Sequence, residues 1–113
     1  MDLGQLDRRV TFLRRAEATD ALNETVAAGF DPIVTVMARR TPVSDGERVA
    51  AMQVAREITD RFVTHWSAEL AALDLTQHLS CEGVVYALAG RKELGRRAGL
   101  EWSAAARPDM EAP

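Results

Sequence analysis

Apolar and polar side chains alternate in several short runs of this chain, a pattern typical of half-buried β-strands. In residues 8–14, RRVTFLR, Val10 and Phe12 fall on one face and Arg9 and Thr11 on the other. This alternation predicts a first strand. Residues 33–40, IVTVMARR, are rich in apolar β-formers and predict a second strand, which Pro42 should end because proline cannot donate to a ladder.

The segment between these strands, residues 16–29, is small, polar and acidic, and it shows no clear period. It predicts a long loop after the first strand, closed by Gly29. Such a loop is uncommon in a compact domain and is often functional; the alternative is a plain mobile hairpin loop. Its acids are Glu17, Asp20 and Glu24, and it has no basic residue.

A capped helix is predicted over residues 45–57. Ser44 stands three residues before Glu47, which is the spacing of a capping box, and Asp45 places favourable negative charge in the first turn. No proline or glycine interrupts the segment after Glu47.

The two sides of this helix differ in character. At about 100° per residue, the stripe that would pack on the rest of the domain holds Ala50, Ala51, Val54, Ala55 and Ile58. Val49 and Met52 point roughly the opposite way. Exposed apolar residues suggest a partner surface, so Val49 and Met52, flanked by Arg48 and Arg56, are the candidate protein-interface residues. The alternative is a helix buried on both sides within one chain.

The second half of the chain also reads mainly as strands. Residues 58–73 fit a helical period and a strand equally well, and periodicity alone leaves both open. Residues 78–89 predict a hairpin that turns at Glu82-Gly83, and residues 91–99 a basic loop. Residues 100–103 alternate and predict a last strand.

Composition favours one globular domain. The chain has 113 residues, 47% of them apolar, and a net charge of −3. We expect a domain over residues 1–104 and a disordered tail over 105–113. Apolar runs are too short to span a membrane, the N-terminus shows no secretory signal, and Cys81 has no second cysteine to pair with. These features predict a chain made in the cytoplasm.

No motif for catalysis, a cofactor or a metal is visible, which argues against an enzyme. His65 and His78 lie far apart and lack zinc-ligand spacing. Cys81 reads as a small core residue rather than a nucleophile. A small β-barrel that binds nucleic acid is the alternative function, because Arg91, Lys92, Arg96 and Arg97 form a short basic cluster. The negative net charge and the few aromatic residues weigh against it.

The chain resembles the phage head–tail joining proteins, also called head-closure or stopper proteins, of tailed phages and gene transfer agents. The resemblance begins in GQLDRRVTFLRR at the N-terminus, where Gly4, Leu6, Arg9 and Val10 match the family's opening motif. It continues through three further motifs, carried by Pro42, Ser44, Gly46 and Glu47, then by Thr59, Arg61 and Phe62, and last by Gly83, Tyr86 and Leu88.

This resemblance implies a mainly β fold, a small closed β-barrel with one helix. It also implies a strand over about 58–66 and a loop from 67 to about 74. The implied function is structural: a ring of six or twelve copies in the head–tail neck of a virion, between the portal or adaptor and the tail proteins. DNA would pass through the lumen without sequence-specific binding, and the acids of residues 16–29 would face the lumen or a partner.

Overall fold

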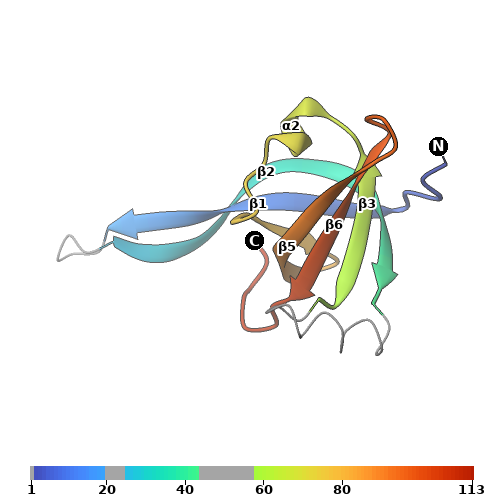
Figure 1. Ribbon diagram of the computed structural model, residues 1–113. Coiled ribbons are helices and arrows are strands. Elements are labelled where there is room, and N and C mark those ends of the chain that lie inside the picture. The colour runs from blue at the N-terminus through green and yellow to red at the C-terminus, as the bar shows by residue number, and fades with distance from the viewer. Residues whose placement is uncertain (1, 20–24, 44–57) are drawn as a thin grey trace.

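The computed structural model describes residues 2–19, 25–43 and 58–113, with side chains described for residues 2–16, 29–43 and 58–113. Six strands close into an antiparallel barrel in the order β1-β2-β3-β6-β5-β4 (Figure 1). Their bounds are β1 Arg8–Thr19, β2 Thr25–Pro42, β3 Asp60–His65, β4 His78–Cys81, β5 Val84–Leu94 and β6 Gly99–Ala106. The predicted mainly β, closed-barrel fold is therefore confirmed.

The inward-facing side chains of these strands form the core. Phe12 packs on Trp102 with ring centroids 4.7 Å apart, and Phe62 packs on Tyr86 at 5.0 Å. The indole nitrogen of Trp102 donates to the hydroxyl of buried Thr64 at 3.1 Å, so the largest core side chain has its polar atom satisfied. Closure of the sheet removes free strand edges within the barrel.

The predicted long loop over residues 16–29 is instead mostly strand. β1 continues to Thr19, and β2 begins at Thr25. The two strands pair from Thr19↔Thr25 back to the barrel, and the register shifts between Phe12 and Leu13 and between Arg15 and Glu17. The alternation expected of strands is absent here because this part of the ribbon leaves the barrel. Neither of its faces then needs a continuous apolar row.

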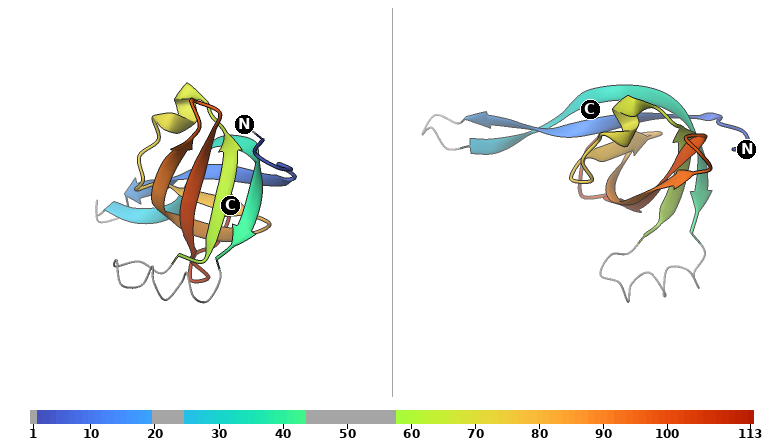
Figure 2. Two further views of the ribbon diagram at one scale, coloured as in Figure 1. Left: turned by 45° about the vertical axis from the view of Figure 1, so that its right-hand side comes forward. Right: turned by 45° about the horizontal axis from the view of Figure 1, so that its top comes forward.

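Figures 1 and 2 show the far halves of β1 and β2 running out of the barrel on the side away from the N-terminus. The molecule is accordingly elongated, with principal extents of 52 × 31 × 22 Å. We call residues 14–19 and 25–31 the arm.

Other predicted boundaries shift by a few residues. The second predicted strand lies within β2, which ends at Pro42, and the hairpin at Glu82-Gly83 is confirmed, with both residues at positive φ as a two-residue type I′ turn needs. β5 and β6 extend into the predicted basic loop, which shrinks to residues 95–98.

The stretch that fitted both helix and strand contains both. β3 occupies the first part, as the resemblance implied. One helical turn, α2 (Ala68–Ala71), lies in the segment expected to be a loop, and the hydroxyl of Ser67 caps it by accepting from the amide of Leu70 at 3.1 Å. Among the described residues, no helix has the length and apolarity that crossing a membrane needs.

The N-terminal segment is fixed against the barrel at two glycines. Gly4 has a φ of +78°, and a Cβ there would lie 2.8 Å from a guanidinium nitrogen of Arg39. A Cβ on Gly99 would lie 2.8 Å from Leu3 and 2.9 Å from the carbonyl oxygen of Thr64. Leu3 is buried as a result, and the opening motif around Gly4 gains a packing role.

After β6, Arg107 donates its amide to the carbonyl of Val85 at 2.8 Å, and its guanidinium binds both carboxylate oxygens of Asp109. The division into a domain over 1–104 and a disordered tail stays a prediction.

Candidate functional site: the barrel mouth and the arm

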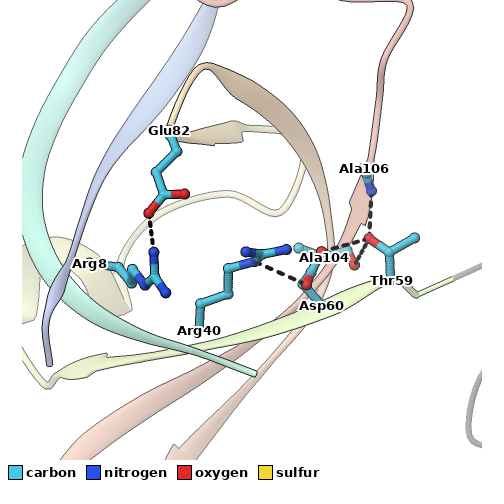
Figure 3. A network of polar contacts seen from close by, with 7 residues as sticks. All are labelled: Arg8, Arg40, Thr59, Asp60, Glu82, Ala104 and Ala106. Atoms are coloured by element: carbon cyan, nitrogen blue, oxygen red, sulfur yellow. Dashed lines mark hydrogen bonds and ion pairs between the residues drawn. The ribbon is translucent and has the colours of Figure 1, made fainter. Parts of the chain in front are cut away.

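One mouth of the barrel carries a polar network, drawn in Figure 3. Asp60 begins β3, and Arg40 lies near the end of β2. Arg40 lies two residues after buried Ala38, and Asp60 lies two residues before buried Phe62. Since every second side chain of a strand shares a face, both side chains face inward. The Arg40 Nε atom donates to Asp60 at 3.2 Å. The Asp60 side chain is only 6% exposed, so its charge depends on these partners.

Thr59 completes the network through its hydroxyl. The oxygen accepts the amide hydrogen of Ala106 at 2.9 Å and the hydroxyl donates to the second carboxylate oxygen of Asp60 at 3.1 Å. Nearby, Arg8 forms an ion pair with Glu82, between the start of β1 and the β4–β5 turn (Figure 3). These contacts tie together strands that are distant in sequence at one end of the barrel.

Two further titratable groups at this mouth are held neutral. Burial raises the pKa of Tyr86, and the nearby Asp60 carboxylate raises it further. Burial likewise raises the pKa of the Cys81 thiol, and the charge of Glu82 adds to the effect. A thiol with a raised pKa is a poor nucleophile, so the structure places Cys81 as a buried core residue.

The mouth also holds the two residues that flank the segment of the predicted helix. The amide of Val43 donates to the carbonyl of Thr59 at 2.9 Å, which brings together the two ends of the intervening segment. The predicted helix and the candidate interface residues Arg48, Val49, Met52 and Arg56 lie in residues 44–57, outside the described residues.

The arm is the second candidate site, after the barrel mouth. Glu17 falls in β1 opposite Ala27, while Asp20 and Glu24 lie outside the described residues. At the root of the arm, Phe30 packs on His78 with ring centroids 5.1 Å apart, and the guanidinium of Arg15 lies 5.9 Å from the Phe30 ring. The contact of Phe30 with His78 anchors the arm to β4, and that of Arg15 with Phe30 links the two strands of the arm.

The basic cluster turns out to be partly structural. Arg91 donates to the carbonyl oxygen of Leu73 at 2.6 Å and to that of Leu70 at 3.3 Å, which ties the segment after α2 to β5. Its guanidinium also lies 5.4 Å from the Trp102 ring, and that of Arg97 lies 4.8 Å from the Trp66 ring. Two of the four cations are therefore engaged within the chain, which weakens the nucleic-acid alternative.

The described residues hold no group of three or more His, Cys, Asp or Glu side chains that could bind a metal. Sequence reasoning missed the Arg40–Asp60–Thr59 network, since the partners are far apart in sequence and no motif links them. Only the pairing of β2 with β3 brings Arg40 near Asp60.

Comparison with known proteins agrees with this architecture. Protein SF1141 of Shigella flexneri 2a, whose structure was determined in solution, superposes with a TM-score of 0.73 at 18% sequence identity. The match covers 96% of this chain and 99% of that one, and at this identity it concerns the fold alone. Comparison with proteins of curated function gives no match.

The sequence matches the family of phage head completion proteins over residues 1–107, nearly its whole length. That family consists of structural virion proteins rather than enzymes, which act together with other head and tail proteins. The chain therefore belongs to the phage head completion protein family and is a structural component of the virion that acts in head closure.

Proposed function

We propose that this chain is a stopper subunit of the head–tail neck. Several copies form a ring that connects the portal or adaptor to the tail proteins, and the lumen of the ring continues the DNA channel. The observation that carries this proposal is the family match over residues 1–107. The elongated shape adds support, since a compact barrel with a projecting ribbon suits a subunit that must reach its neighbours.

The barrel mouth would present the ring's contact segment. Because Val43 and Thr59 are hydrogen-bonded, residues 44–57 start and end at the same point of the barrel. The proposed interface residues Arg48, Val49, Met52 and Arg56 would then be offered to a neighbouring subunit or neck protein from this mouth.

Replacement of Met52 by glutamate tests this interface. Met52→Glu should abolish neck assembly, since a charge in an apolar contact is left without a partner, while the isolated chain stays folded. Gln53→Glu is the matched control, because it adds the same charge at a polar neighbouring position. Assembly of Met52→Glu at the wild-type level would contradict the interface.

The acids Glu17, Asp20 and Glu24 would line the lumen or face a partner. Negative charge along a channel repels the DNA backbone and limits sticking during transit. Replacing the three acids with lysine should slow DNA ejection from intact particles, and replacing them with glutamine should have a smaller effect. Ejection at the normal rate with three lysines would exclude a position in the lumen.

The stopper role itself is tested by removing the protein from its producing system and viewing the particles by electron microscopy. Head closure predicts heads that fill and then leak, beside separate tails. Normal tailed particles would refute the proposal. The nucleic-acid alternative instead predicts salt-sensitive gel shifts that depend on Lys92 and Arg96.

A further inference from the structure

We propose that the arms of neighbouring copies pair edge to edge, so that the β1 edge of one arm adds to the β2 edge of the next. This inference rests on the proposed ring. It assigns to the arm a definite partner, a second copy of this chain, and a definite mode of contact, which is main-chain strand addition.

Neither edge of the arm is paired with a further strand among the described residues, and the C-terminal residues Asp109, Met110 and Glu111 lie near Arg15, Gly29 and Phe30 at the root of the arm. β4 pairs with β1 only over residues 10–13, and β3 pairs with β2 only over residues 38–42. Beyond these points no described strand lies against residues 14–19 of β1 or residues 25–37 of β2, apart from the ladder between β1 and β2 themselves. Each edge therefore presents backbone N–H and C=O groups to which another strand can bind.

The far part of the arm has little to prevent such pairing. Pro32 blocks strand addition at the root of β2, because it has no N–H to donate. Residues 25–31, by contrast, contain neither proline nor lysine, the residues that commonly protect an edge. A two-stranded ribbon is also marginally stable by itself in water, so added strands would stabilise it.

A second copy fits these edges in direction and in charge. β1 and β2 are antiparallel, so rotating one copy onto the next about a ring axis places β1 of one arm beside β2 of its neighbour, again antiparallel. Within one arm the exposed Arg14 lies opposite the exposed Asp31. The same step brings Arg14 of one copy toward Asp31 of the next, which adds a favourable charge pair. A heterologous contact of this kind repeats around a ring and leaves no open edge when the ring closes.

A shortened arm tests whether the strands are needed. Arg15 and Phe30 are paired directly, so replacing residues 16–29 by Asn-Gly should join them through a tight type I′ turn and leave the barrel intact. We expect this variant to show a cooperative thermal unfolding transition, as a folded barrel does, but to be absent from assembled particles. In the matched control, residues 20–24 become Gly-Ser-Gly-Ser-Gly, which keeps both strands of the arm, and assembly should persist. Assembly of the shortened variant at the wild-type level would overturn the pairing.

Mixed cross-linking identifies the partner. In a Cys81→Ala background, one copy carries Arg14→Cys and another carries Asp31→Cys, and both are made together in the particle-producing cells. Because each chain has one cysteine, a short bismaleimide can join the two positions only between copies. We expect the mixed dimer to form in preference to either dimer of a single variant.

Cross-links to a different neck protein, or none in particles that contain both variants, would overturn arm pairing alone. Absence of the wild-type chain from particles would instead overturn the proposed stopper role. The two failures are therefore distinguishable.

Discussion

Replacement of Thr59 by valine probes the polar network at the barrel mouth. Valine has nearly the shape of threonine but lacks the hydroxyl, so Thr59→Val removes the two shorter hydrogen bonds of this group, and its longer contact with the Ala104 carbonyl, with little change in packing. The Ala106 amide loses its acceptor at 2.9 Å, and the Asp60 carboxylate loses a donor at 3.1 Å.

The size of the effect follows from these two contacts. A neutral hydrogen bond contributes about 0.5–1.5 kcal/mol and one to a charged group about 1.5–3 kcal/mol. Thr59 is only partly buried, so we take the lower values and expect a loss of about 2 kcal/mol in the free energy of unfolding. For a chain of this length that corresponds to a fall in Tm of about 8 °C.

Scanning calorimetry on the wild type, Thr59→Val and Thr59→Ser measures this difference. Thr59→Ser keeps the hydroxyl and loses one methyl group, which should cost less than about 1 kcal/mol. If Thr59→Val melts with the wild type, or if both variants melt together, the hydroxyl does not stabilise the mouth and the reasoning is refuted.

Three further predictions concern other parts of the barrel. Gly99→Ala should overpack the contact with Leu3, reduce the free energy of unfolding by about 1–3 kcal/mol and so lower Tm. Gly90→Ala is the control: the nearest side-chain atom lies 3.9 Å from the added Cβ, so this variant should melt like the wild type. Arg91→Met should speed amide hydrogen exchange in the segment after α2 while sparing the barrel core. Equal exchange rates in this segment of Arg91→Met and of the wild type would contradict the anchoring role. Since burial raises the pKa of Tyr86, unfolded chains release its proton before folded ones, so stability should fall as the pH rises above about 10. Urea titrations should show that Tyr86→Phe lacks this part of the alkaline loss, whereas a parallel loss in both proteins would count against it.

The sequence predicts those elements whose side chains meet the core. Val10 and Phe12 alternate because one face of β1 is buried, and Glu82-Gly83 marks a hairpin because the turn needs two residues at positive φ. The arm could not be predicted in this way. Its strands run out of the barrel (Figure 1), so the core imposes no alternation of apolar and polar residues on them, and the sequence of residues 16–29 therefore predicts a loop.

The polar network at the barrel mouth was not predicted from the sequence, for a related reason. The network of Arg40, Thr59 and Asp60 depends on strand register, and register arises from pairing between segments that no local pattern connects. For the basic cluster, the sequence suggested an exposed role that the structure does not support for every member. Arg91 looked like a surface cation in the sequence, but its guanidinium serves carbonyl groups of a neighbouring segment.

The continuity of β1 and β2 from barrel to arm has a mechanical consequence. The arm has no hinge loop at its root, because the same two strands form both parts (Figure 2). The arm and the barrel wall are therefore one continuous pair of strands. A load applied at the far end of the arm is carried along two covalent chains into the pairings of β1 with β4 and of β2 with β3, and from there to the mouth where residues 44–57 are attached.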